Sequence, residues 1–165
     1  MHATLHLHLT DRRGRRVAAR RVRNSVMQGG ARLVAQLFSG EGGPITHMAV
    51  GASGDPTPDD FDVAALSPTV EGDATPLAGS LEAPVGPFTI VPDITRRLML
   101  VRVRATLPEA AAVGLVREAG LVAQVGEQRI LYNRVTFPEV SKGDDHELTM
   151  FWEVTFPYGD LHWTV

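Results

Sequence analysis

Residues 148–156 read Leu148-Thr149-Met150-Phe151-Trp152-Glu153-Val154-Thr155-Phe156, and this stretch decides the fold. Every second residue is large and apolar, and the residues between them are mostly polar. This two-residue period is typical of a strand with one face buried. Burial contributes roughly 1.5 to 3 kcal/mol of transfer free energy for each large apolar side chain, so five of them predict a central core strand.

Further strands are predicted along the chain, at residues 45–51, 96–107, 113–123 and 129–137. In the second of these, Val101 and Val103 share one face, and Arg102 and Arg104 lie on the other. Residues 45–51 have no purely polar face, which suits a strand that is covered on both sides.

The N-terminus is predicted to form a β-hairpin. Residues 4–10 alternate leucine with polar residues, residues 11–14 are a polar turn that ends in glycine, and residues 16–22 can return as the partner strand. The leucines are expected to face the interior.

One helix is predicted after this hairpin, with Asn24 or Ser25 as its N-cap and Gly40 just beyond its end. Its apolar face comprises Val26, Gly30, Leu33, Val34, Leu37 and Phe38. A glycine inside a helix costs about 1 kcal/mol relative to alanine, so Gly29 and Gly30 indicate close packing or a break after the first turn. The expected fold is therefore mainly β (α+β): an antiparallel β-sandwich or barrel-like sheet with one packed helix near residues 25–39.

The length of 165 residues and a hydrophobic content of 44% fit a single domain spanning residues 1–165. A proline-rich, acidic and irregular insertion is expected at about 52–92, with brief strands near 77–81 and 88–91, and a C-terminal arm at about 157–165. The chain has no cysteine, which excludes disulfides and thiolate chemistry. We expect neither a secretory signal nor a membrane span, because no apolar run is long enough.

Charge is segregated along the chain, although its net value is only −3. Residues 1–40 hold eight arginines and one aspartate, a net charge of +7, whereas residues 41–95 hold nine acids and no base. Fifteen of the sixteen basic residues are arginine, which suits bidentate interface contacts and equally fits a bias in genome composition.

This segregation predicts an interface between neighbouring copies. A basic hairpin would contact the acidic loop of an adjacent copy or partner, and a C-terminal arm would bury apolar side chains. The predicted interface residues are Arg16, Arg20, Arg21 and Arg23 in the hairpin, Asp55, Asp59, Asp60 and Asp62 in the loop, and Tyr158 and Trp163 in the arm.

Catalytic and metal-binding patterns are incomplete. In residues 51–55, Asp55 replaces the final glycine of a G-x-S-x-G nucleophile elbow, and residues 59–62 lack the spacing of a calcium loop. Histidines 2, 6 and 8 share a strand face, but no third well-placed ligand accompanies a pair of them, so a solvated face is the favoured interpretation. Nothing sets the separation of Glu118 from Glu153 for acid/base work. We expect no enzyme activity, no cofactor, no metal and no small-molecule substrate.

A resemblance adds a biological expectation. It rests on the order of residues 23–37 (Arg23-Asn24-Ser25-Val26 onward), Ile45-Thr46-His47-Met48-Ala49-Val50-Gly51, Glu118-Ala119-Gly120-Leu121, Asn133-Arg134-Val135-Thr136-Phe137 with Lys142, and Trp152-Glu153-Val154-Thr155-Phe156. In this order the chain resembles small tail-associated structural proteins of bacteriophages and of phage-like contractile injection systems.

The resemblance implies a multi-copy component of a virion or injection particle, at the tail, baseplate, collar or fibre attachment. Its partners would be copies of itself and other particle proteins, with assembly in the bacterial cytoplasm. The acidic middle of the chain is longer than that pattern suggests, and no fibre shaft follows, which favours an adaptor or connector.

Two other classes of function remain as alternatives. The arginine-rich hairpin could bind nucleic acid through its phosphates, but the chain is acidic overall and no aromatic residue lies among these arginines to stack on bases. A receptor- or carbohydrate-binding module would expose aromatic residues, for which Tyr158, His162 and Trp163 are the candidates.

Overall fold

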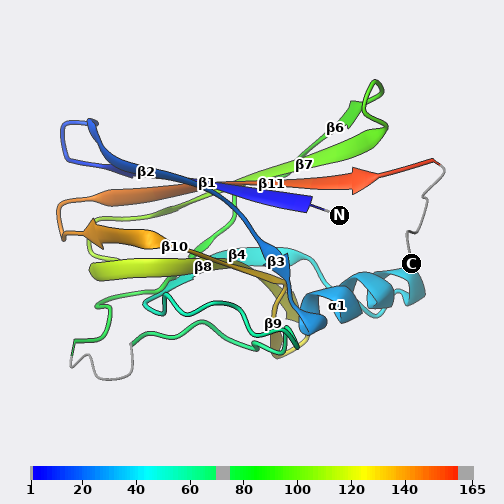
Figure 1. Cartoon of the computed structure of the whole chain (residues 1–165), viewed down its shortest axis with the longest axis horizontal. Coiled ribbons are helices and arrows are strands. Elements are labelled where there is room, and N and C mark those ends of the chain that lie inside the picture. The colour runs from blue at the N-terminus through cyan, green and yellow to red at the C-terminus, as the bar shows by residue number, and fades with distance from the viewer. Residues whose placement is uncertain (1, 70–74, 160–165) are drawn as a thin grey trace.

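The computed structural model of the chain describes residues 2–69 and 75–159. Two antiparallel sheets pack face to face as a sandwich, and one short helix lies at one end (Figure 1). Sheet A has the strand order β2-β1-β11-β7-β6, and sheet B has the order β3-β10-β8-β4-β5, with β9 also paired to β8. The predicted mainly β fold with one helix is confirmed, and it is the sandwich rather than the barrel.

Sheet A forms because its strands alternate apolar and polar residues. Its strands are β1 (His2–Thr10), β2 (Arg16–Arg23), β6 (Thr89–Asp93), β7 (Leu98–Leu107) and β11 (Glu147–Pro157). The inward side chains of β1 and β11 meet across the register Leu7↔Met150, and Leu5 and Trp152 are 0% and 1% exposed. The predicted hairpin and the predicted core strand are both confirmed.

Sheet B is more deeply covered than sheet A. Its strands are β3 (Ser25–Val26), β4 (Ile45–Gly51), β5 (Glu82–Pro84), β8 (Gly114–Val125), β9 (Gln128–Leu131) and β10 (Asn133–Lys142). The single strand predicted at 129–137 is wrong, because the ladder is interrupted at Tyr132 and β10 then continues to Lys142. Two covered faces explain why β8 and β4 lack a clean polar side.

Helix α1 (Gln28–Ser39) starts later than predicted. Met27 is its N-cap, not Asn24 or Ser25, because Ser25 and Val26 pair with β10 as a short strand. A Cβ added to Gly30 would lie 2.0 Å from the carbonyl oxygen of Tyr132, so the predicted close packing at this glycine is confirmed. The predicted apolar face is wrong at its end, where Leu37 and Phe38 are 54% and 92% exposed.

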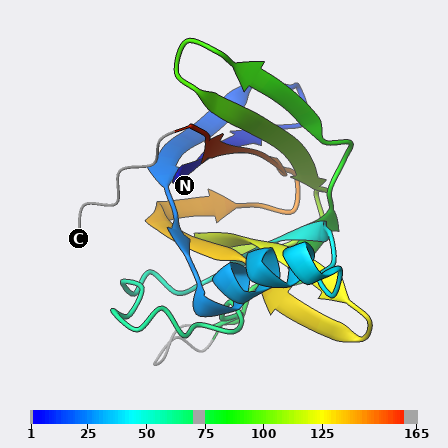
Figure 2. The ribbon, with the colours of Figure 1, turned by 90° about the vertical axis from the view of Figure 1, so that its right-hand side faces the viewer.

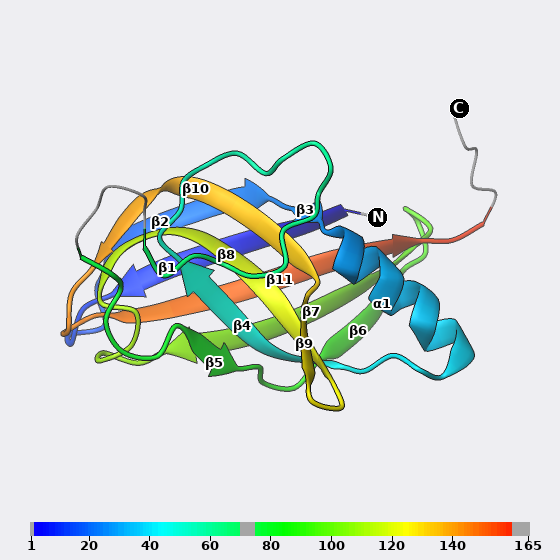
Figure 3. The same cartoon turned by 90° about the horizontal axis from the view of Figure 1, so that it is seen from below.

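Residues 52–69, the first part of the irregular segment between β4 and β5, lie on the outer side of sheet B as a third layer (Figure 3). Val63 and Leu66 pack there on Met27, Val122 and Leu131 in a small second core. Among the described residues of the predicted insertion, 52–69 and 75–92, the strands are β5 and the greater part of β6. The strand expected near 88–91 is confirmed by β6, whereas that near 77–81 is wrong, because only Ala78 bridges to Val113 before β5 begins at Glu82.

Within the described residues, no helix is long and apolar enough to cross a lipid bilayer.

Candidate functional site

A buried ion pair joins the two central strands of sheet B. Arg134 Nε of β10 donates to Glu118 Oε2 of β8 over 2.7 Å, and the two side chains are 4% and 1% exposed. Sequence analysis missed this pair, because the residues are 16 positions apart and only the strand register brings them together. A buried charge without a partner is strongly unfavourable, so each residue requires the other.

The same pair holds the irregular segment against sheet B. Glu118 Oε1 accepts a hydrogen bond of 2.7 Å from the backbone N–H of Ser67, and Arg134 Nη1 donates to Thr57 Oγ1 over 3.1 Å. Gly51 leaves the necessary room, since a Cβ there would lie 2.2 Å from Glu118 Oε1. The pair is therefore the anchor on which the acidic loop is ordered.

Lys142 is a second buried charge, at the opposite end of β10 from Arg134. Its Nζ donates to the carbonyl oxygens of Pro108 and Glu109, each over 2.9 Å. Burial lowers the pKa of this ammonium, while nearby carboxylates, of which Glu109 contributes most, oppose the shift. These contacts tie the β7–β8 connection to β10, which is a structural role.

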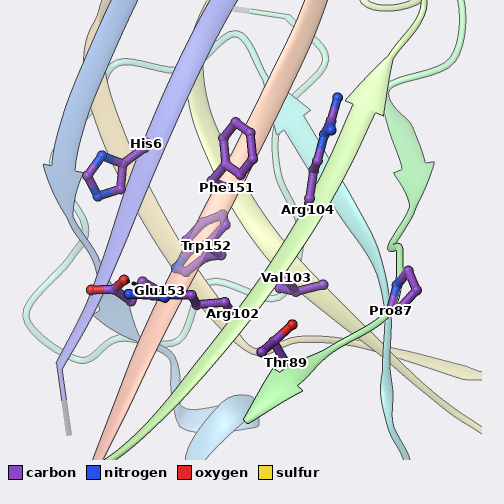
Figure 4. A pocket seen from close by; sticks show the side chains of 9 residues that line it. All are labelled: His6, Pro87, Thr89, Arg102, Val103, Arg104, Phe151, Trp152 and Glu153. Carbon is purple, nitrogen blue, oxygen red and sulfur yellow. Dashed lines mark hydrogen bonds and ion pairs between the residues drawn. The ribbon is translucent and has the colours of Figure 1, made fainter. Parts of the chain in front are cut away.

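The outer face of sheet A carries a row of cationic and aromatic side chains. The register places Arg21, His6, Phe151 and Arg104 side by side on β2, β1, β11 and β7. Phe151 lies between His6 and Arg104 beside a shallow cavity of about 380 Å³ (Figure 4). The Arg104 guanidinium carbon is 5.4 Å from the centre of the Phe151 ring, a distance typical of a cation–π contact.

The arginines in and beside this row are exposed: Arg21 and Arg104 within it, and Arg16 and Arg23 farther along β2. None of them forms an ion pair with any residue that the structure describes. Arg102, by contrast, donates to Glu153 Oε2 over 3.0 Å. We call the four arginines, together with His6 and Phe151, the basic face.

Arg20, which the sequence predicts as an interface residue, does not lie on the basic face. Its Nε donates to the carbonyl oxygen of Pro138 over 3.0 Å, and its Nη2 donates to that of Glu139 over 2.8 Å. Because β2 alternates its side chains, Arg20 points toward sheet B while Arg21 points outward. It links β2, the edge strand of sheet A, to β10 of sheet B.

The predicted acidic loop is exposed and keeps its charges unpaired. Asp55, Asp59, Asp60 and Asp62 are all exposed, and none forms an ion pair among residues 2–69 and 75–159. The backbone beneath them is fixed, since Gln28 donates through its N–H to the carbonyl oxygen of Phe61 and through Nε2 to that of Asp60. We call residues 55–62 the acidic segment.

The basic face and the acidic segment lie on opposite sides of the molecule. The acidic segment lies below sheet B, whereas the basic face is the outer surface of sheet A (Figure 1). Stacked sheets are about 10 Å apart, and the Debye length is about 8 Å at physiological ionic strength. The two groups of charge therefore cannot neutralise each other within one molecule.

Helix α1 and the β6–β7 hairpin lie at the same end of the sandwich (Figure 2). A groove of about 210 Å³ runs between α1 and the inner face of sheet A, with Leu37, Phe88 and Phe156 in its wall. Large apolar side chains are exposed at the groove and on the adjoining α1 and β6–β7 hairpin: Leu37, Phe38, Phe88, Ile90, Ile94 and Met99. We call these six residues the apolar end.

Two further predicted interface residues, Tyr158 and Trp163, belong to the C-terminal arm. Tyr158 is 41% exposed, and its backbone N–H donates to the carbonyl oxygen of Arg97, which extends the pairing of β11 with the β6–β7 hairpin. Trp163 lies outside the described residues. Glu118 and Glu153 are on different sheets, each with its own arginine, and are not a carboxylate pair.

Histidines 6 and 8 lie on the outer face of β1, as predicted. Burial lowers the pKa of His8, and the neighbouring charges of Arg16 and His6 lower it further. Among the described residues, no three side chains of His, Asp or Glu come together as a metal ion would need. Gly51 is the last residue of β4, and in the irregular stretch that follows Ser53 Oγ donates to Asp55 Oδ2 over 3.2 Å.

No known protein family matches the chain, and neither the curated proteins nor the solved structures contain a match.

Proposed function

We propose that the chain is a non-enzymatic structural subunit of a phage tail or phage-like injection particle, as a baseplate, collar or fibre-attachment component. Its work is to hold particle proteins together through contacts among several copies. The apolar end is the observation that carries the multi-copy part of this proposal. The placement in a tail or injection particle rests on the sequence resemblance.

The apolar end supports an assembly role, because exposing many large apolar side chains to water at one end of a molecule costs free energy. A contact that covers them recovers this free energy. Single exposed apolar residues are ordinary on a soluble protein, but a contiguous apolar patch marks an interaction surface. At this end Phe38 and Ile94 are 92% and 77% exposed, and the groove between α1 and sheet A is lined almost entirely by apolar side chains. Contact with particle proteins would remove this surface from water.

Sedimentation of the purified chain over a range of concentrations tests the multi-copy part. We expect a mass above the 17.8 kDa of one chain. Replacing Phe38 and Ile94 with serine should lower the associated fraction, because it removes apolar side chains from the proposed contact. The fold should be retained, because both side chains are exposed and contribute nothing to the core. Val17→Ser is the matched control, since Val17 is 48% exposed on β2, outside the apolar end. A wild-type chain that stays monomeric throughout would overturn this part.

Quantitative mass spectrometry of purified tail or injection particles, from the organism that encodes the chain, tests the placement. Several copies per particle are expected. Particles that lack the chain would refute the placement without affecting the conclusion on self-association.

Nucleic-acid binding is the second candidate, because one observation now favours it. The register of sheet A brings Phe151 among the unpaired arginines, which supplies the aromatic residue that the N-terminal sequence lacks. Arginines that neutralise phosphates together with a stacking ring form a general single-strand binding surface. Retention on a single-stranded oligonucleotide that is lost steeply with salt would favour this candidate.

A further inference from the structure

We propose that the basic face binds the acidic segment of a second copy, so that copies join head to tail. This inference rests on the proposed function, and it names the partner and the two surfaces that meet. It requires that the two surfaces be accessible, opposite in charge and unable to meet within one chain.

The two surfaces match in their unpaired charge. The basic face offers Arg16, Arg21, Arg23 and Arg104, and the acidic segment offers Asp55, Asp59, Asp60 and Asp62. All eight side chains are exposed, and none has an ion-pair partner among the described residues. Arginine presents two parallel N–H donors to a carboxylate, so each contact can be bidentate.

The supports beneath both surfaces are rigid. The arginines project from paired strands of sheet A, and Arg104 is held against the Phe151 ring. The acidic segment is held to sheet B through Thr57 and to α1 through Gln28. Because neither surface must be ordered first, little conformational entropy opposes their association.

The placement of the surfaces on opposite sides determines the kind of assembly. A contact between two different surfaces of the same chain is heterologous, and its repetition gives a ring or an open filament rather than a twofold dimer. Each added copy presents a free basic face at one end and a free acidic segment at the other. The association should therefore continue beyond two copies.

A charge-exchange experiment tests the pairing. One variant reverses the basic face (Arg21→Glu with Arg104→Glu), and the other reverses the acidic segment (Asp59→Arg with Asp62→Arg). In each variant alone, like charges face each other across the contact, so the Kd of association should rise by at least about tenfold. An equimolar mixture restores opposite charges at every contact and should recover association.

Matched controls change the net charge equally at other exposed sites. They are Arg13→Glu with Arg32→Glu, and Glu41→Arg with Glu127→Arg, all at exposed positions. These variants should associate like the wild type. Circular dichroism and thermal melting establish that every variant is folded, and recovery in the mixture cannot come from an unfolded chain.

The outcomes separate the two proposals. If the wild type is monomeric at every concentration, the proposed function fails. If the wild type associates but both reversed variants associate equally well, or if their mixture does not recover, only the head-to-tail pairing is overturned. Unchanged association of the face variant, with loss of binding to an oligonucleotide, would assign the basic face to nucleic acid instead.

Discussion

At the scale of single residues, the Glu118–Arg134 pair connects sheet B to the irregular segment through Ser67 and Thr57. We predict that Glu118→Ala lowers the free energy of unfolding by about 3 to 5 kcal/mol, because it leaves the buried charge of Arg134 without its counter-charge. The matched control is Glu153→Ala, since Glu153 pairs with Arg102 on the exposed face at a similar distance. That change should cost about 0 to 1 kcal/mol.

Chemical denaturation of both variants measures the difference. Equal losses would mean that the buried pair has no special role. Limited proteolysis adds a second readout, because the loss of Glu118 also removes the acceptor for the Ser67 N–H. Cleavage within the acidic segment should become faster in Glu118→Ala and remain unchanged in Glu153→Ala.

His8 gives a prediction about titration. Its pKa lies below the ordinary value of about 6.5, chiefly through burial and secondly through the charge of Arg16. We expect Arg16→Ala to raise the His8 pKa toward 6.5, as followed by NMR titration of the imidazole. Arg13→Ala is the control, since Arg13 is not among the groups that shift His8.

The sign of the linked effect on stability follows from this lowered pKa. Between the folded pKa and about 6.5, the unfolded chain binds more protons at His8 than the folded chain. The contribution of His8 to stability is therefore present above pH 6.5 and is lost as the pH falls through the folded pKa. If Arg16→Ala leaves the His8 pKa unchanged or lowers it, the charge of Arg16 is not a cause of the lowered pKa.

At the scale of elements, the packing of α1 on Tyr132 opposes its helix propensity. Alanine in place of glycine favours a helix by about 1 kcal/mol, but a Cβ at Gly30 would lie 2.0 Å from the Tyr132 carbonyl oxygen. Overpacking typically costs about 1 to 3 kcal/mol and more for a backbone clash, so Gly30→Ala should lower the melting temperature.

Gly29→Ala is the matched control within the same turn. Its nearest neighbour would be the Ile130 Cγ2 methyl at 3.3 Å, a side-chain atom that can move by a few tenths of an ångström. We expect its melting temperature to stay equal to the wild type or to rise. A Gly30→Ala variant as stable as Gly29→Ala would show that α1 is not held closely on Tyr132.

The elements also show what a sequence can predict. Strands β1, β2, β7 and β11 follow from alternation, because each has one face in the core and one in water. The start of α1 and the break at Tyr132 do not follow, because tertiary hydrogen bonds set them: Met27 N–H donates to the Tyr132 carbonyl oxygen, and Gln28 N–H donates to that of Phe61. Local propensity contains no information on such partners.

The same distinction applies to the site residues. The basic hairpin and the acidic loop are visible as composition, but Arg104 and Phe151 join the basic face only through the register of sheet A. Arg20 is not part of the basic face, because side chains alternate along β2 and Arg20 points toward sheet B. The Glu118–Arg134 pair depends on the register of sheet B and could not be predicted from either residue alone.

At the scale of the whole molecule, the basic face, the acidic segment on the opposite side and the apolar end are the three surfaces through which we propose that copies associate. Electrostatic association between exposed surfaces weakens as salt shortens the Debye length, from about 30 Å at 0.01 M to about 3 Å at 1 M. The apolar contacts should persist under the same change. Salt therefore separates the two contributions to assembly.

Sedimentation equilibrium of the unmodified chain, at about 0.05 M and about 0.5 M salt, tests the central claim most directly. We predict an average mass well above 17.8 kDa at the lower salt concentration and a smaller mass at the higher one. An average mass of 17.8 kDa at every protein concentration and at both salt concentrations would contradict it.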